Sequence, residues 1–270
     1  MRSEDGWTGP RATIDCVVLP PRPERSQAGA RDRVVMCRAA RPTALVEERF
    51  MTIMGERWQS YWADKTTPQY VREDDAHYRE YAEELRLLFP DPFPARVLEI
   101  GCGNGALHRH LAFDKCDRYV GVDFSERMLG VFHETDPGVE LVHADGPSYR
   151  SNDEFDLIFS SQVAQYWSPT QLADHVDNAL TMLSARGAII ISGIPWSRMR
   201  FAYARGDMTG GRRRSLPTAL LGFGSELVRK RLGAWYDFPE LSQVAARSGL
   251  RVQFYGSIHY AYRFHAVLRP

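Results

Sequence analysis

The sequence lacks the features that most directly tie a chain to a membrane or to a polyanion. Its 34 Lys and Arg residues equal its 34 Asp and Glu residues, so the whole chain has no net charge that would attract nucleic acid. No apolar run approaches the roughly 20 residues that cross a bilayer, and the first thirty residues have no apolar core of a secretory signal. We therefore expect a cytoplasmic protein with no membrane span, and the charge balance argues against a nucleic-acid partner.

Cysteine is scarce as well. The chain has four cysteines, none of them in a C-x-x-C pair, which favours free thiols in a reducing compartment. No cluster of histidines and carboxylates has the spacing of a metal site, so we expect a site without metal. The oligomeric state stays open.

Periodic patterning is missing from the first 45 residues, which hold prolines and scattered arginines instead. Such a composition does not bury a core, so we expect residues 1–45 to be a disordered or loosely attached extension. Later methionines, such as Met36 and Met51, leave open whether this stretch is translated. Residues 46–270 are expected to form one domain.

Apolar segments alternate with helical segments in this domain. Strands are expected at 96–100, 118–123, 139–144, 155–160 and 187–194, with a final strand pair at 251–259 and 262–268. Helices are expected at about 69–88, 104–112, 125–134, 169–184 and 239–248. Strands that are apolar throughout and separated by helices indicate an α/β fold with a mostly parallel sheet covered on both faces.

A glycine-rich turn follows the first of these strands, in the stretch VLEIGCGNG (97–105). Gly101, Gly103 and Gly105 keep the backbone bare, and unpaired N–H groups at the start of the expected helix 104–112 favour an electron-rich ligand. The same letters also fit a variant of the dinucleotide fingerprint. The glycines alone therefore allow two kinds of cofactor.

Three acids near the ends of successive strands distinguish the two. Glu99 would repel a pyrophosphate but attract a cationic amino group. Asp123 can accept both hydroxyls of a ribose, and Asp145 can accept from an adenine amino group. This set fits adenosine joined to an amino acid better than it fits a dinucleotide.

With these residues the chain resembles the class I S-adenosylmethionine-dependent methyltransferases over about residues 95–195. VLEIGCGNG, YVGVDFSERML, VHADG and FDLIFSSQVAQYW are similar to that family's successive motifs, and the final strand pair resembles its reversed hairpin. The resemblance implies a Rossmann-like sheet of seven strands, mostly parallel, with a terminal antiparallel hairpin. It implies S-adenosylmethionine as cofactor, held by Glu99, Gly101, Cys102, Gly103, Asn104, Gly105, Asp123, Phe124, Met128, Asp145, Gly146, Ser160 and Gln162.

The methyl acceptor is expected to approach past the fourth strand. Many relatives have a histidine there, whereas this chain has Gln165 and Tyr166, which leaves the general base unassigned. Gln165, Tyr166 and His259 are the catalytic candidates. Trp58, Tyr61, Trp62 and Tyr166 are the candidates for contact with the substrate. A basic insert, 196–235, is expected to form a helical lid.

The sequence thus predicts transfer of a methyl group to an oxygen or nitrogen of a small molecule, such as a sugar or a biosynthetic intermediate. A nucleic-acid methyltransferase remains an alternative, supported only by the basic insert. A non-catalytic protein that binds S-adenosylmethionine and serves a partner is the alternative of a different class.

Overall fold

A computed structural model describes residues 75–208, 213–229 and 233–270, all within the unit Pro42–Pro270. The predicted extension 1–45 lies outside these residues. Within them, no helix is long and apolar enough to cross a membrane.

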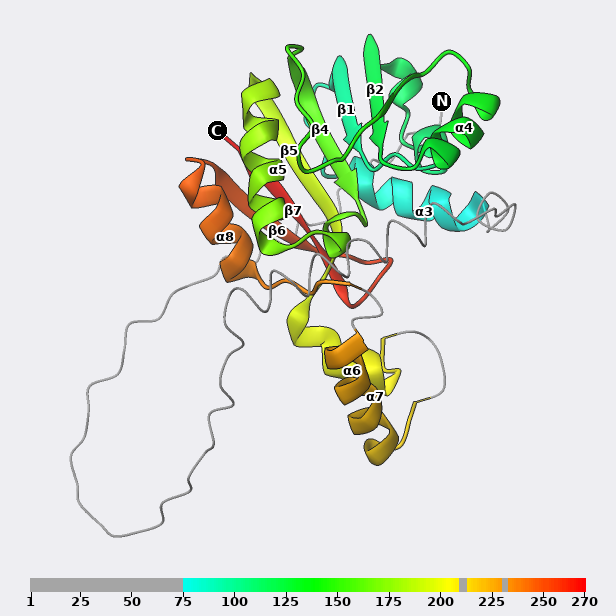
Figure 1. The fold of residues 1–270 in the computed structure, drawn as a ribbon, viewed down its shortest axis with the longest axis vertical. Coiled ribbons are helices and arrows are strands. Elements are labelled where there is room, and N and C mark those ends of the chain that lie inside the picture. The colour runs from blue at the N-terminus through cyan, green and yellow to red at the C-terminus, as the bar shows by residue number, and fades with distance from the viewer. Residues whose placement is uncertain (1–74, 209–212, 230–232) are drawn as a thin grey trace, which may run out of the picture. The chain divides into compact units, whose positions relative to one another are not determined.

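One sheet of seven strands organises the domain (Figure 1). The strands are β1 (Arg96–Ile100), β2 (Arg118–Asp123), β3 (Glu140–His143), β4 (Phe155–Ser161), β5 (Leu183–Pro195), β6 (Arg251–Gly256) and β7 (Arg263–Arg269). Their order is β3-β2-β1-β4-β5-β7-β6, and only β7 runs antiparallel to its neighbours. The predicted fold class, with its terminal antiparallel hairpin, is confirmed.

Helices cover both faces of the sheet, as the apolar strands predict. The helices are α3 (Asp75–Arg86), α4 (Glu126–Thr135), α5 (Pro169–Met182), α6 (Arg200–Arg205), α7 (Leu216–Arg229) and α8 (Phe238–Arg247). Residues of α5 and α8 pack with Leu98 and Ile189 on one face, whereas residues of α3 and α4 pack with Val97 and Ile190 on the other. Neighbouring strand residues thus enter opposite core layers, because successive side chains of a strand alternate between faces.

Local sequence signals fix several of these helix starts. Ser168 and Gln171 form a capping box at α5, with Pro169 at the first helical position. Asp237 and Glu240 form the same arrangement at α8. These caps satisfy backbone N–H groups that have no partner within their helix.

The helix expected at 104–112 is wrong. Two short 3-10 helices, His108–His110 and Phe113–Lys115, take its place. Gly105 has a left-handed φ of 73° and Ala112 one of 61°, and neither conformation belongs to an α-helix. The buried side chains of Leu111 and Phe113 pack in the core and fix this irregular path.

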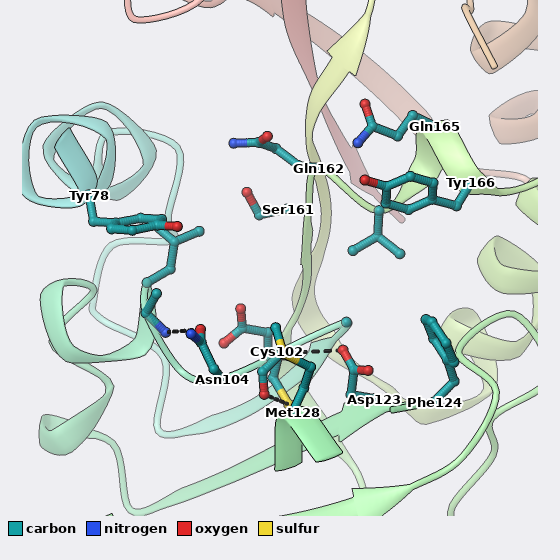
Figure 2. A pocket seen from close by; sticks show the side chains of 16 residues that line it. Tyr78, Cys102, Asn104, Asp123, Phe124, Met128, Ser161, Gln162, Gln165 and Tyr166 are labelled. Carbon is teal, nitrogen blue, oxygen red and sulfur yellow. Dashed lines mark hydrogen bonds between the residues drawn. The ribbon is translucent and has the colours of Figure 1, made fainter. Parts of the chain in front are cut away.

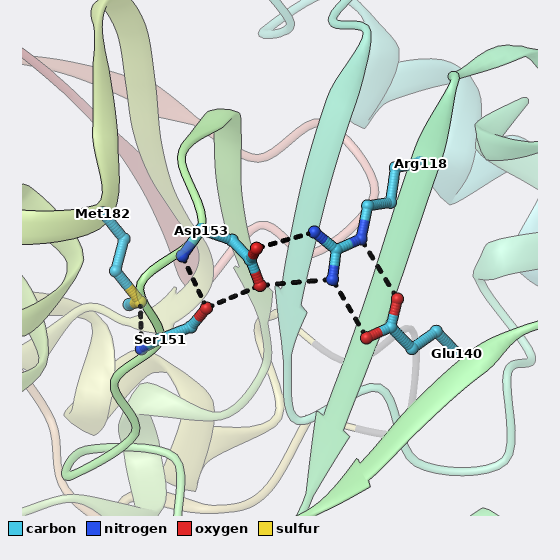
Figure 3. A network of polar contacts seen from close by, with 5 residues as sticks. All are labelled: Arg118, Glu140, Ser151, Asp153 and Met182. Carbon is cyan, nitrogen blue, oxygen red and sulfur yellow. Dashed lines mark hydrogen bonds and ion pairs between the residues drawn. The ribbon is translucent and has the colours of Figure 1, made fainter.

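Polar and charged side chains connect the amino-terminal ends of neighbouring strands (Figure 3). The guanidinium of Arg118, the first residue of β2, contacts Glu140 on β3 at 3.1 Å and Asp153 before β4 at 2.9 Å. The Ser151 hydroxyl also donates to Asp153, at 2.7 Å. Exposed contacts of this kind add little stability individually, but here they join three neighbouring segments.

Candidate active site

A cavity of about 270 Å³ opens at the carboxyl ends of β1, β2 and β4 (Figure 2). Parallel α/β sheets bind ligands at this edge. Most of the predicted cofactor residues line it, namely Glu99, Gly101, Cys102, Gly103, Asn104, Asp123, Phe124, Met128 and Gln162. The structure therefore brings together residues that lie more than sixty positions apart in the sequence, from Glu99 to Gln162.

The glycine turn is held against β2 by backbone hydrogen bonds. The N–H groups of Gly101 and Cys102 both donate to the Val122 carbonyl, at 2.7 and 3.1 Å. A Cβ at Gly101 would lie 2.3 Å from a methyl group of Val163, so a side chain there would collide with the loop after β4. Gly105 does not line the cavity, but a Cβ there would lie 2.5 Å from the Phe132 ring. These glycines allow the turn to pack closely while its surface stays open.

Glu99 is a buried acid, 3% exposed, on the cavity wall. Its carboxylate accepts a hydrogen bond of 2.6 Å from the hydroxyl of Tyr119 on β2. Gly121, which pairs with Glu99, leaves room for this contact, because a Cβ there would lie 3.2 Å from the Tyr119 oxygen. Burial raises the pKa of Glu99 to about 7, and the nearby Asp123 adds to the rise. A cationic ligand group beside Glu99 would lower its pKa again and favour the charged carboxylate.

Asp123 connects the end of β2 to the glycine turn. Its carboxylate accepts from the N–H groups of Gly103, at 2.9 Å, and Ser125, at 2.8 Å. Burial raises its pKa, while these backbone donors oppose the rise. Each carboxylate oxygen retains a further lone pair, so Asp123 can also accept from a ligand hydroxyl.

The side of the cavity predicted for adenine has apolar walls. Phe124 and Met128, half-buried, line it. Asp145 and Gly146 do not line the cavity. Asp145 is exposed, and its carboxylate accepts a hydrogen bond of 2.6 Å from the Ser148 hydroxyl. Gly146 packs closely against Ile100. Their role at the adenine edge remains a prediction.

The end of β4 places a different serine in the cavity. Ser161 lines it, whereas Ser160 is 1% exposed, does not line it and has an Oγ with no hydrogen-bond partner among the described residues. Successive strand residues face opposite sides, so only one of the two serines can face the cavity. The sequence shows two adjacent serines at this point, but it does not show which of them faces the cavity.

The structure brings two of the three catalytic candidates to the cavity and leaves the third outside it. Gln165 and Tyr166 line the cavity, in a short 3-10 helix (Ala164–Tyr166) after β4. His259 does not line it and contacts His77 instead, at 3.0 Å between ring nitrogens. Trp58, Tyr61 and Trp62 lie outside the described residues.

Sequence reasoning missed several lining residues. The wall is completed by Tyr78 from α3, Ala106 and Leu107 after the glycine turn, Ser161 at the end of β4 and Val163 in the loop after it. The helical spacing predicts Tyr78 on a helix, but only the packing of α3 against the sheet brings its ring to the cavity.

The insert predicted at 196–235 is largely helical, with α6 and α7 packed through the rings of Phe201 and Phe223. The insert is attached to the short 3-10 helix Ala164–Tyr166, because the Ala234 N–H donates to the Gln165 carbonyl at 2.6 Å. Whether the insert acts as a lid remains a prediction.

Comparison with known proteins finds a match to a family model in the central segment. A model of a methyltransferase domain matches residues 97–187. A trans-aconitate 2-methyltransferase of Acidovorax sp. (strain JS42) is 33% identical over 99 residues, 36% of this chain and 38% of that protein. The same enzyme of Rhizobium leguminosarum bv. trifolii (strain WSM2304) is 30% identical over 125 residues, 46% and 47% of the two chains. The chain thus spans less than half the length of these curated relatives.

Solved structures share the fold. DesVI of Streptomyces venezuelae aligns with a TM-score of 0.55 at 17% identity, over 72% of this chain and 92% of that one. The N-methyltransferase NodS of Bradyrhizobium japonicum WM9, solved with S-adenosyl-L-homocysteine, aligns with a TM-score of 0.52 at 18% identity, over 80% and 97%. At these identities the likeness establishes the architecture alone.

Proposed function

We propose that this chain, which has the class I methyltransferase fold and a methyltransferase domain at residues 97–187, transfers a methyl group from S-adenosylmethionine to a small molecule. The observation that carries the proposal is the pair of buried acids, Glu99 and Asp123, on either side of the bare glycine turn. A pyrophosphate would meet repulsion there, whereas a ligand with an ammonium group and a ribose would be stabilised.

The described residues fit this cofactor. Glu99 would hold the ammonium group, because it has no cationic partner among the described residues and its raised pKa marks an unneutralised site. Asp123 would hold the ribose hydroxyls, and Phe124 and Met128 would flank the adenine. The Gly101–Gly105 turn would cover the methionine end.

The cofactor supplies an activated methyl group on a sulfonium, which already contains its leaving group. The chain's own residues then have to position the acceptor and exclude water. Gln165 and Tyr166, which line the cavity after β4, would do this, and Gln162 beside them would lie near the sulfonium.

For the acceptor we propose an oxygen or nitrogen of a small molecule, such as a sugar or a biosynthetic intermediate, methylated in the cytoplasm. The similar proteins support a small acceptor but differ among themselves: the curated relatives are named for trans-aconitate, whereas NodS is described as an N-methyltransferase. The acceptor panel should therefore include organic acids, amines and sugars.

The test is a transfer assay on the full chain with methyl-labelled S-adenosylmethionine, scored by the mass of the methylated product. The panel contains trans-aconitate, nucleotide sugars, free sugars and primary amines, with total RNA as a separate arm. Label in one small molecule supports the proposal. Label in RNA alone, or in nothing although the panel spans these classes, contradicts it.

A further inference from the structure

Gln162, which lines the cavity, has an unusual backbone conformation (Figure 2). It follows Ser161, the last residue of β4, and its φ is +57°, in the left-handed region that residues other than glycine and asparagine rarely occupy. Such a residue persists only where the surrounding structure holds it, and residues of this kind cluster at functional sites. The residues that hold Gln162 in this conformation are therefore candidates for a role in the site.

A β-bulge in the neighbouring strand β5 provides one contact to Gln162. The register of β5 against β7 shifts there, so that Ser192 and Gly193 together face the single residue His265. The bulge brings the Ser192 carbonyl to the Gln162 N–H, which donates to it at 2.9 Å. Bulges are common beside active sites, where the extra residue redirects a side chain.

Gly193 is the residue of the bulge that leaves space for Gln162. Its φ is +64°, and a Cβ there would lie 2.8 Å from Cγ of Gln162 and 2.7 Å from the hydroxyl of Tyr81. A bulge disrupts the hydrogen bonds of the ladder between the strands. Because Gly193 is buried, its N–H and its carbonyl then need partners from elsewhere in the chain.

Two side chains of β7 supply these partners. Nδ1 of His265 accepts from the Gly193 N–H at 3.3 Å, and an Nη of Arg263 donates to the Gly193 carbonyl. His265 and Arg263 are two positions apart on the strand, so their side chains face the same side of the sheet. Together these two residues, the bulge clamp, hold Gly193 through both of its backbone polar groups.

The direction of the His265 contacts is fixed by their partners. A backbone N–H can only donate, so Nδ1 of His265 carries no proton, and the proton is on Nε2. Nε2 then donates to the Glu84 carboxylate at 2.9 Å. Burial alone would raise the pKa of Glu84, but this contact and the N–H groups of Ile258 and His259 lower it, so the carboxylate stays charged. One tautomer of His265 therefore satisfies both contacts.

Arg263 is a buried cation with an unsatisfied donor. The residue is 4% exposed, and its Nε has no hydrogen-bond partner among the described residues. Its guanidinium lies 5.5 and 5.1 Å from the ring centres of Tyr260 and Tyr262, in the turn between β6 and β7. Burial of a charge with an unmade hydrogen bond is costly. An arginine at this place is better explained by its contact with Gly193 than by a gain in stability.

We propose that His265 and Arg263 are positioning residues for methyl transfer, which hold the Ser192–Gly193 bulge and, through the bulge, hold Gln162 at the cavity. Neither side chain lines the cavity, so both act through Gln162. The inference rests on the proposed function in placing the sulfonium near Gln162. Loss of the clamp should slow the transfer step, because a small displacement beside the reacting atoms is enough to do so. It should leave cofactor binding at Glu99 and Asp123 intact.

Matched variants separate the clamp from ordinary packing. His265→Asn keeps an acceptor close to the position of Nδ1, whereas His265→Leu removes it. Arg263→Met removes the donor to Gly193 and keeps an unbranched side chain that can fill the space. The control is His175→Leu, at a histidine of α5 that is 2% exposed and whose Nε2 has no partner among the described residues. Thermal unfolding shows which of these variants fold.

Hydrogen exchange of the Gln162 N–H tests the clamp without a methyl acceptor. It is followed by nuclear magnetic resonance on the full chain with S-adenosyl-L-homocysteine. Exchange should be slow in the wild type, in His175→Leu and in His265→Asn. In His265→Leu and Arg263→Met it should be about tenfold faster, while the N–H groups of β1 and β2 exchange as in the wild type. A Gln162 N–H that stays equally slow in both of these variants overturns the inference.

Transfer of label to the acceptor found in the panel tests the second step. In His265→Leu and Arg263→Met, kcat should fall about 10- to 100-fold while the Kd for S-adenosyl-L-homocysteine is unchanged. Gln162→Ala should lose a similar factor, and adding His265→Leu to it should lower kcat little further, because the clamp acts only through that side chain. Losses that multiply in the double variant overturn the inference. If the wild type labels no member of the panel, the proposed function fails, and the exchange result still decides whether the clamp holds Gln162.

Discussion

Glu99 combines burial with a charge that the free protein does not neutralise. The Tyr119 hydroxyl is its hydrogen-bond donor among the described residues, and Asp123 adds a second acid nearby. A buried acid without a cationic partner is costly in its charged form, so it retains its proton to a higher pH. The residue that is best placed to bind an ammonium group is thus a source of instability without a ligand.

The first prediction concerns stability. Between the ordinary pKa of 4.5 and the folded pKa of about 7, the folded chain binds more protons at Glu99 than the unfolded chain does. The contribution of Glu99 therefore becomes unfavourable as pH rises through about 7. Glu99→Gln should stabilise the free protein at pH 8 by about 1–3 kcal/mol and change little at pH 5. Thermal unfolding at both pH values checks this, and equal effects at both would contradict it.

The second prediction concerns cofactor affinity. An ammonium group favours the charged carboxylate, so ligand binding must displace the Glu99 proton below pH 7. The Kd for S-adenosyl-L-homocysteine should therefore be about tenfold higher at pH 6 than at pH 8. Glu99→Gln should bind more weakly at pH 8 and show little of this dependence. Calorimetry at the two pH values measures both effects, and an equal dependence in the variant would exclude Glu99 as the titrating group.

The third prediction separates two roles of Asp123. Its carboxylate holds the Gly103 N–H and is placed to accept from a ribose. Asp123→Ala removes both contacts and should raise the Kd for S-adenosyl-L-homocysteine about a hundredfold, since charged hydrogen bonds contribute about 1.5–3 kcal/mol each. Asp123→Asn keeps one acceptor oxygen and should lose less affinity. Unchanged affinity in a folded Asp123→Ala protein would refute this assignment.

At the scale of elements, two glycines with similar backbone angles test the packing of the glycine turn. Gly105 has a φ of 73° and Gly249 one of 70°. A Cβ at Gly105 would lie 2.5 Å from the Phe132 ring, whereas one at Gly249 has no neighbour within 4 Å among the described residues. Both substitutions thus incur the same backbone strain, and only one adds a collision.

The fourth prediction follows from this pair. Gly249→Ala should cost about 1 kcal/mol of stability through strain alone and leave the Kd for S-adenosyl-L-homocysteine unchanged. Gly105→Ala should cost about 2–4 kcal/mol, because overpacking adds to the strain, and should weaken cofactor binding as the turn shifts. Chemical denaturation and calorimetry on both variants give the comparison. Equal losses would show that collision with Phe132 is not decisive.

The strands could be predicted from the sequence more closely than the loops between them. β1 and β2 begin and end where the apolar runs predict, and the capping box at Ser168 locates the start of α5. The helix expected after Gly105 does not form, because tertiary packing of Leu111 and Phe113 overrides the local pattern. A short helical pattern beside glycines is therefore a weak predictor of an α-helix.

Some residues of the site could likewise be predicted from the sequence, whereas others depend on how the elements pack. Glu99 and Asp123 could be identified because strand ends in a parallel sheet meet at one edge. Ser161 rather than Ser160 faces the cavity, and that choice depends on how far β4 extends before its turn. Tyr78 reaches the cavity only through the packing of α3, which no local pattern in the sequence reports.

For the whole molecule, the comparisons divide the chain into a shared and an individual part. The methyltransferase model ends at residue 187, just as β5 begins its buried run, and the curated relatives match less than half of the chain. The shared segment holds the predicted cofactor residues. The insert between β5 and α8 and the turn with Tyr260 lie beyond the match to the model. The candidates for contact with an acceptor fall on both sides of this boundary, because Gln165 and Tyr166 lie within the match and the insert lies beyond it.

The whole chain has no net charge, yet the cavity holds two buried acids, so cofactor choice is a local electrostatic property. Calorimetric titration of the full chain at pH 8 with S-adenosyl-L-homocysteine and, separately, with NAD decides which cofactor the cavity binds. We expect saturable, one-site binding of S-adenosyl-L-homocysteine and no binding of NAD. Binding of NAD without binding of S-adenosyl-L-homocysteine would contradict it.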